Sequence, residues 1–176
     1  MRRICFAALF SFATAQAQSS NPLVSEARFP WTVVRTNLIK MAEKMPEEFY
    51  GYRPTPEIET FAQRLAHIVG ANLGVCTGLL TNTARPMTRS SAATKADLIV
   101  ALNESIAACD KAFDATTDQN ALEQITSRLG GPFPPQPTRS RLATLNNMVR
   151  HTNEVYGYMS VYLRLKGVVP PSSLPE

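Results

Sequence analysis

Histidine is scarce in this chain, with only His67 and His151 among 176 residues. The count alone excludes a metal centre built from three histidine side chains, which is one common arrangement for catalytic zinc. Any metal bound by this chain must therefore take its other ligands from a different residue type, from solvent or from a substrate. The question of metal chemistry depends on what accompanies the two histidines.

Proline is absent from three long stretches, residues 57–85, 87–131 and 138–169, although the chain contains 13 prolines. A proline inside a helix costs about 3 kcal/mol, so these stretches are free to be helical. A fourth segment, 26–45, carries Pro30 only near its expected start, where the first helical turn tolerates proline. No strand-like alternation competes with the helical spacing of the apolar residues.

Capping residues and stop signals give the expected helix boundaries. Thr55-Pro56-Glu57 has the features of a helix start, and Lys166-Gly167 before a pair of prolines has those of a helix end. The expected helices are 26–45, 55–80, 94–113 and 138–166, with a weaker helical segment at 120–129. Four long amphipathic helices in one domain predict an all-α four-helix bundle.

The N-terminal residues 1–17 have the pattern of a secretory signal peptide. Met1-Arg2-Arg3 is basic, residues 4–15 are mostly apolar, and Ala15-Gln16-Ala17 has the form of a cleavage site. The apolar run is too short to span a membrane as a mature helix. We expect cleavage after Ala17 and secretion to a bacterial periplasm, with a mature domain over 18–176; a disordered or anchoring N-terminus is the alternative.

The charge distribution gives no sign of a nucleic-acid partner. Arg2 and Arg3 carry half of the net charge of +4, because residues 1–17 contain no acidic side chain. The other charges are scattered, apart from a local cluster at Arg139, Arg141 and Arg150. Basic residues interleaved with aromatic ones, which would mark a nucleic-acid surface, are missing. We therefore expect no nucleic-acid partner, and no membrane partner once the signal peptide is removed.

Two of the three cysteines, Cys76 and Cys109, lie outside the predicted signal peptide. In an oxidising compartment an even pair favours a disulfide, which would contribute about 3–4 kcal/mol by the chain-entropy model. The alternative is a pair of buried thiols, which are common in protein cores. We favour the disulfide over the thiols, and both over a catalytic cysteine.

The second predicted helix has little bulk beside His67. Ala71, Gly74 and Gly78 lie within about 40° of His67 on a helical wheel of about 100° per residue, whereas Cys76 lies on the opposite side. Interior glycine costs about 1 kcal/mol relative to alanine, so its presence needs a reason. Either a hollow beside His67 admits a ligand, or a neighbouring helix approaches closely.

The fourth predicted helix places several side chains near His151. Asn147, Glu154, Val155 and Tyr158 all lie on the same side of this helix as His151, within about 60° of it on a wheel of about 100° per residue. Histidines four residues apart would direct two imidazoles at one metal, but position 155 is a valine. We expect Tyr158 to be a core tyrosine with a buried hydroxyl partner. The residues expected to line a pocket beside the histidines are Ala71, Gly74, Asn147, Val155 and Tyr158.

Three groups of residues occur in order along nearly all of the mature chain. They are Trp31 with Ala42-Glu43-Lys44-Met45-Pro46; Tyr52-Arg53-Pro54-Thr55-Pro56-Glu57 followed by Phe61 and Leu65-Ala66-His67; and His151-Thr152-Asn153-Glu154-Val155-Tyr156-Gly157 running into residues 162–173. With these groups the chain resembles the DinB-like (DinB/YfiT) superfamily of metal-dependent helical bundles.

The resemblance implies an up-down-down-up bundle with a long crossover and a divalent metal held by three histidines. His67 and His151 match the first two ligands, and Val155 stands where the third is expected. In such relatives the metal, often zinc or nickel, is thought to activate a thiol or water for transfer, isomerisation or hydrolysis.

Three hypotheses follow. The one we favour is an exported DinB-like protein of unassigned activity with a degenerate site, in which zinc, nickel or iron binds weakly or not at all. The second is a metal-dependent transferase or hydrolase, similar to thiol S-transferases, in which Glu154 completes a two-histidine, one-carboxylate set with His67 and His151. Glu154 could instead pair with Arg150 on a solvated face. The third is a disulfide-stapled structural or stress-related protein with no small-molecule site.

The substrate is unidentified, and a homodimer is compatible with bundles of this kind.

Overall fold

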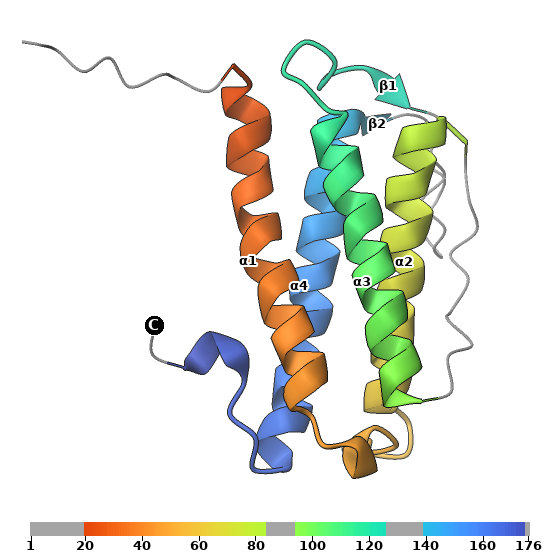
Figure 1. Cartoon of the computed structure of the whole chain (residues 1–176), viewed down its shortest axis with the longest axis vertical. Helices are drawn as coiled ribbons and strands as arrows, with labels where there is room; N and C mark the ends of the chain where they lie inside the picture. The colour runs from red at the N-terminus through yellow and green to blue at the C-terminus, as the bar shows by residue number, and fades with distance from the viewer. Residues whose placement is uncertain (1–19, 84–93, 126–138, 175–176) are drawn as a thin grey trace, which may run out of the picture.

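Four long helices lie side by side in the computed structural model of this chain (Figure 1). The structure describes residues 20–83, 94–125 and 139–174, so the predicted signal peptide lies outside the described residues. The elements are α1 Pro22–Lys44, the 3-10 turn η1 Glu47–Phe49, α2 Phe61–Thr81, α3 Lys95–Asp114, β1 Gln124–Ile125, β2 Arg139–Ser140, α4 Arg141–Leu165 and the 3-10 turn η2 Pro171–Ser173.

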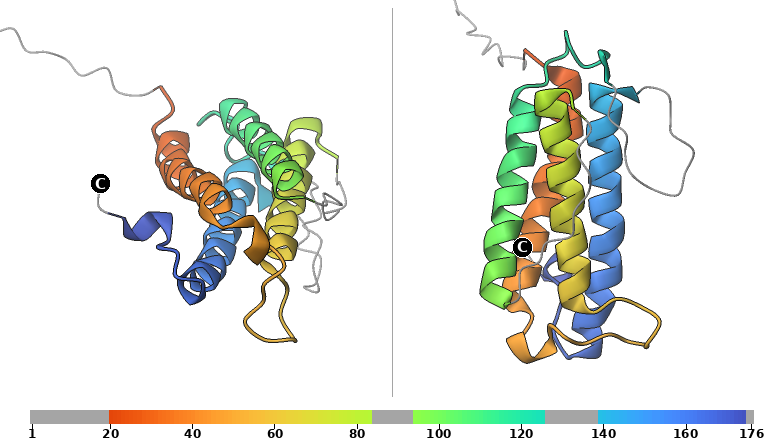
Figure 2. Two further views of the ribbon diagram at one scale, coloured as in Figure 1. Left: turned by 60° about the horizontal axis from the view of Figure 1, so that its bottom comes forward. Right: turned by 90° about the vertical axis from the view of Figure 1, so that its right-hand side faces the viewer.

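The helices form the up-down-down-up bundle that the resemblance implied. α2 and α3 run in the same direction, and α1 and α4 run in the opposite one (Figures 1 and 2). α2 ends at one end of the bundle, and α3 begins at the other. α2 packs against α3 and α4, while α1 packs against α4 and α3. α1 and α2, although adjacent in the sequence, therefore occupy diagonal corners.

One apolar core runs through the bundle and fixes the face that each helix turns inward. Its largest fully buried side chains are Trp31, Phe61, Phe113, Leu38, Met41, Met45, Leu65, Ile68, Leu79, Leu98, Leu102 and Leu145. The Trp31 indole also donates a hydrogen bond of 2.8 Å to Asp110, which accepts a second one of 2.7 Å from Arg35. None of the helices in the described ranges is both long and apolar enough to cross a membrane.

The ends of the later helices follow their capping residues. α3 begins after Thr94, which forms a reciprocal capping box with Asp97, as the sequence predicted. α4 ends before Gly167, whose positive φ of 72° is a backbone conformation that glycine adopts without strain. The expected start of the second helix at Thr55 was wrong, because the capping box that opens α2 is formed by Thr60 and Gln63.

The start of α1 was also placed too late. α1 begins at Pro22, and Pro30 lies inside it on the exposed side, where its ring contacts solvent. The early start has a tertiary cause: the Asp118 carboxylate accepts hydrogen bonds of 3.1 Å from the backbone N–H groups of Leu23 and Val24. These amides have no partner within their own helix, so a residue almost 100 positions away caps it.

The segment expected as a weak helix over 120–129 is not helical in its described part. Residues 124–125 pair antiparallel with 139–140, so two short strands exist where none was expected. Asn120 explains part of this, because its amide bonds the backbone at Thr117 and Ala115 and so competes with helical hydrogen bonding. Residues 126–129 and 138 lie outside the described residues, and α4 itself begins at Arg141.

The predicted disulfide is present. Cys76 of α2 and Cys109 of α3 are joined by a bond of 2.00 Å, and both residues are fully buried in the core. The bond links two helices that run in the same direction and follow one another in the sequence. The sequence separation between the two cysteines is 33 residues.

Removing this bond should lower the stability of the fold. We expect the Cys76→Ala/Cys109→Ala variant to lose about 3–4 kcal/mol of unfolding free energy, because the unfolded chain is no longer constrained by the loop. Urea unfolding followed by circular dichroism measures the loss, and the wild-type protein in reductant serves as the matched comparison. Equal stability of oxidised, reduced and variant proteins, or two free thiols in the mass spectrum, would contradict this prediction.

Candidate metal site

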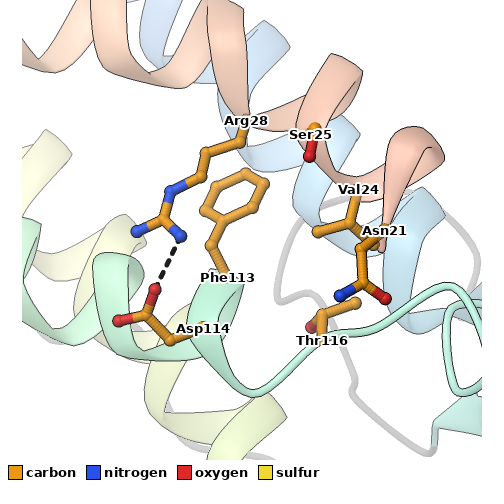
Figure 3. Close-up of a pocket in the computed structure, with 7 residues that line it drawn as sticks. All are labelled: Asn21, Val24, Ser25, Arg28, Phe113, Asp114 and Thr116. Atoms are coloured by element: carbon orange, nitrogen blue, oxygen red, sulfur yellow. Dashed lines mark hydrogen bonds and ion pairs between the residues drawn. The ribbon is translucent and has the colours of Figure 1, made fainter. Parts of the chain in front are cut away.

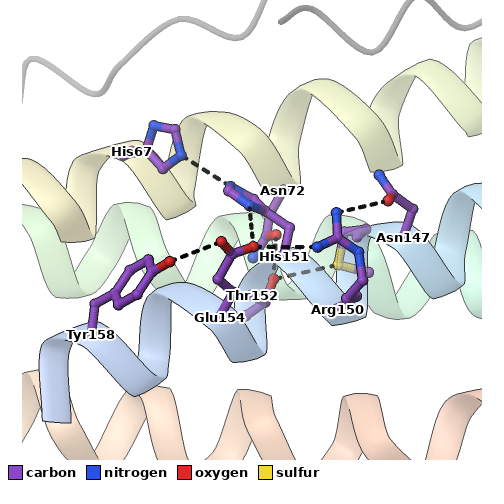
Figure 4. Close-up of polar contacts among 9 residues, drawn as sticks. His67, Asn72, Asn147, Arg150, His151, Thr152, Glu154 and Tyr158 are labelled. Atoms are coloured by element: carbon purple, nitrogen blue, oxygen red, sulfur yellow. Dashed lines mark hydrogen bonds and ion pairs between the residues drawn. The ribbon is translucent and has the colours of Figure 1, made fainter. Parts of the chain in front are cut away.

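α2 and α4 bring the two histidines into direct contact (Figure 4). The Nε2 atoms of His67 and His151 lie 3.0 Å apart, and the rings meet edge to face with an interplanar angle of 74°. His67 is half-buried, and the side chain of His151 is 34% exposed. His67 and His151, two of the three residues that the sequence offered as candidate ligands, are therefore neighbours at the edge of the α2–α4 interface, within reach of solvent.

At this distance the two rings form one N–H···N hydrogen bond, in which one nitrogen donates and the other accepts. Such a bond requires at least one neutral ring. The pKa of His151 is lowered, first by burial and second by His67, with smaller contributions from Arg150 and Arg64; Glu154 opposes them. The neutral imidazole, which is the form that binds metals, is thus favoured.

The separation of the two nitrogens also fits a shared metal ion. With metal–nitrogen bonds of about 2.0–2.1 Å, the two nitrogens lie about 2.9 Å apart for a right angle at the metal and about 3.3 Å for a tetrahedral angle. The 3.0 Å between His67 and His151 falls inside this range. Within the described ranges, however, the protein offers no group of three His, Cys, Asp or Glu side chains that could hold a metal. Among the described His, Cys, Asp and Glu side chains, two nitrogens and no third ligand therefore lie within reach of one ion.

Glu154 lies on the other side of the His151 ring. Its Oε2 is 4.0 Å from Nδ1 of His151 and 3.3 Å from the Arg150 guanidinium, and its Oε1 accepts a hydrogen bond of 3.0 Å from the Tyr158 hydroxyl. The ion pair with Arg150 that the sequence offered as the alternative role is therefore present. In this geometry Glu154 lies beside Nδ1, the His151 nitrogen that is not in contact with His67, at a distance too long for a hydrogen bond.

The remaining residues expected around the pocket lie in different surroundings. Val155 is 2% exposed and belongs to the apolar core, and Ala71 is also buried, whereas Gly74 is half-buried. Asn147 accepts a hydrogen bond of 3.1 Å from Arg150 on the exposed side of α4. The structure thus separates these residues between the interior of the bundle and its solvated face.

The expectation of a buried hydroxyl for Tyr158 was wrong. The residue is 51% exposed, and its hydrogen bond to Glu154 raises the pKa of the hydroxyl. Its ring lies 5.9 Å from the Arg64 guanidinium, which also forms an ion pair of 3.3 Å with Glu59. Arg64 was missed in the sequence, although its position three residues before His67 places it on the same face of α2.

A buried polar pair was missed as well. Asn72 of α2 accepts a hydrogen bond of 3.1 Å from the Thr152 hydroxyl of α4 (Figure 4), and both residues are almost completely buried. A signal for it was available, because Asn72 is an amide within the apolar run of the second predicted helix.

A cavity of about 200 Å³ lies apart from the histidines, between the start of α1 and the end of α3 (Figure 3). An ion pair of 2.6 Å between Arg28 and Asp114 borders it. Its lining residues are Asn21, Val24, Ser25, Arg28, Phe113, Asp114 and Thr116. It shares no residue with the histidine pair.

Comparisons with known proteins agree on one family. The model of the DinB superfamily matches residues 31–159. The fold is similar to a DinB-like protein from Bacillus cereus, with a TM-score of 0.63, 16% sequence identity and coverage of 85% of this chain and 94% of that one. It is also similar to a DinB-like protein from Bacillus subtilis, with a TM-score of 0.63, 18% identity and coverage of 89% and 96%. A comparison with curated proteins finds no match.

The lowered pKa of His151 makes the fold less stable in mild acid. Because the unfolded chain binds the proton more readily, stability from this group is fully present above the unfolded value of 6.5 and is lost as pH falls from there through the folded pKa. We expect urea midpoints to drop between pH 7.5 and 5.5, with a smaller drop in His151→Gln. Equal slopes in the two proteins would assign the effect to other groups.

Proposed function

Because the chain belongs to the DinB superfamily, we propose that it is a member whose metal site is reduced to two protein ligands. His67 and His151 bind a divalent transition metal weakly through their Nε2 atoms. The observation that carries this proposal is the 3.0 Å separation of these atoms, which fits a shared ion without rearrangement of the helices.

Val155 explains why binding should be weak. It stands one turn after His151, where the family pattern expects a third histidine, and its side chain packs in the apolar core. A metal held by these two neutral imidazoles would take its remaining ligands from solvent or substrate, whereas zinc sites normally keep three or four protein ligands. Imidazole suits zinc, nickel, copper and iron, so the two ligands select little among these ions.

The surrounding side chains support the pair. Glu154 lies behind His151 and favours the tautomer in which Nδ1 carries the proton and Nε2 faces His67. Arg64 and Arg150 place positive charge near His151, which helps to keep its ring neutral. A metal bound to two such rings supplies a Lewis acid that polarises a coordinated thiol or water.

A second candidate function is a metal-dependent transferase or hydrolase. The partial exposure of His151 favours it, because a substrate could reach the open positions of an ion held there. Glu154 would act in this case as the group that orients His151, since it does not face the shared position. Thiol transfer and hydrolysis are the reactions to assay with metal-loaded protein, and His67→Ala is the matched inactive control.

We also propose that the protein is exported. The pattern of residues 1–17 supports this, and so does the disulfide between Cys76 and Cys109, because disulfides persist mainly in oxidising compartments. N-terminal sequencing of the periplasmic protein should give a chain that begins at Gln18. A periplasmic protein that keeps Met1, or a protein confined to the cytoplasm, would contradict the proposal.

Restoring the missing ligand tests the metal site. We expect Val155→His to tighten zinc or nickel binding by about two orders of magnitude, because it adds a third imidazole one turn from His151. Isothermal titration calorimetry on tag-free protein measures the affinity. Val161→His is the control, since it adds the same side chain to an exposed position of α4.

Two further variants make the result decisive. His67→Ala and His151→Ala should each abolish the weak wild-type binding. If Val155→His binds no better than wild type while the protein remains folded, the two histidines do not form the core of a metal site.

A further inference from the structure

We propose that Asn72 and Thr152 form a positioning pair, which sets the register of α4 along α2 and thereby holds His67 against His151. Asn72 follows His67 by five residues, and Thr152 follows His151 directly. Their hydrogen bond of 3.1 Å is the polar contact between the two helices that lies deepest in the described core.

The pair is buried in apolar surroundings. Asn72 is 1% exposed and Thr152 is fully buried, and the Thr152 hydroxyl also lies 3.7 Å from the sulfur of Met148. The Nδ2 of Asn72 has no hydrogen-bond partner, so half of the amide is left unsatisfied. A buried amide with one unsatisfied end contributes little to stability, and an apolar side chain of the same size would often do better. Such an amide instead makes one alignment of two packed helices more favourable than the neighbouring alignments. This role is best documented for buried asparagine in coiled coils.

A polar contact that sets the alignment with α2 matters more for α4 than for α3. α3 is joined to α2 by the Cys76–Cys109 bond, which fixes the height of one helix against the other. No disulfide joins α4 to α2 among the described residues, and most of their shared surface is apolar, which discriminates poorly between neighbouring registers.

A shift of one helical turn would move α4 by about 5.4 Å along α2. It would place Met148 or Tyr156 near the height of Asn72 and leave both ends of the buried amide without a partner. The same shift would carry the Nε2 atoms of His67 and His151 beyond hydrogen-bonding distance and beyond the reach of one metal ion. The alignment that satisfies Asn72 is therefore the alignment that assembles the histidine pair.

The test uses the metal-free mature protein, so its result does not depend on the proposed function. In Asn72→Leu we expect a melting temperature no lower than that of wild type, but weakened or lost nuclear Overhauser contacts between the two imidazole rings. The control is Ser105→Ala, another buried polar residue, whose hydroxyl bonds Leu102 within its own helix and should leave the contacts unchanged. The exchanged variant Asn72→Thr/Thr152→Asn should recover the contacts.

Unchanged ring contacts in folded Asn72→Leu would overturn the proposal. If that variant does not fold, Thr152→Val decides the matter, since it keeps the shape and removes the hydroxyl: separated rings support the positioning role, and retained contacts overturn it. Zinc affinity is a second measurement, expected to fall about tenfold or more in Asn72→Leu, as for other residues that orient ligands. If wild type binds no zinc at all, the proposed metal site fails while the ring contacts still test the positioning pair.

Discussion

Helix α2 is held on its two sides by different means, a covalent bond to α3 and side-chain packing to α4. The disulfide between Cys76 and Cys109 fixes α2 and α3 as one unit in the core. On the other side, α4 meets α2 through apolar packing and polar contacts, and the contact between His67 and His151 lies near solvent. The candidate site depends on this second interface, because each helix contributes one of the two imidazoles.

The helices themselves could be predicted from residues that act locally. Proline-free stretches gave their number, and Thr94 with Asp97 gave one start correctly. The errors came from a distant contact in one case and from competing local signals in the others. The start of α1 depends on Asp118, which reaches it from the far end of α3, and Thr55 carried helix-start signals while Thr60 formed the cap. Local capping residues are compatible with several helix starts, and tertiary contacts determine which of these starts the helix adopts.

The residues of the candidate site could be predicted from the sequence, but the distances between their side chains could not. Two histidines in a chain with no others are easy to single out, but their approach to 3.0 Å depends on how α4 aligns with α2. The role of Glu154 depends on which ring nitrogen it faces, which no spacing rule decides. The burial of Tyr158 was predicted wrongly. Helical spacing indicates which side of α4 a residue occupies, but it does not indicate how far along α4 the neighbouring helix extends.

Val155 contributes core packing at the position where the family resemblance implies a histidine. A fully buried valine stabilises a fold by about 1.5–3 kcal/mol relative to an exposed one, while a buried imidazole without a metal must find a hydrogen-bond partner or shift its pKa. At this position the protein therefore has an apolar contact that needs no polar partner. The two histidines that stay satisfy one another through their shared hydrogen bond, so the fold does not need a metal to pair them.

The diagonal placement of α1 and α2 has a consequence for how the chain folds. In a simple up-and-down bundle, neighbouring helices form hairpins whose contacts are close in sequence. Here α1 finds its packing partners in α3 and α4, and 50 residues, 45–94, separate the end of α1 from the start of α3. Closing such long loops costs entropy before any contact is gained, so this bundle should reach its native state more slowly than a hairpin-built bundle of the same length.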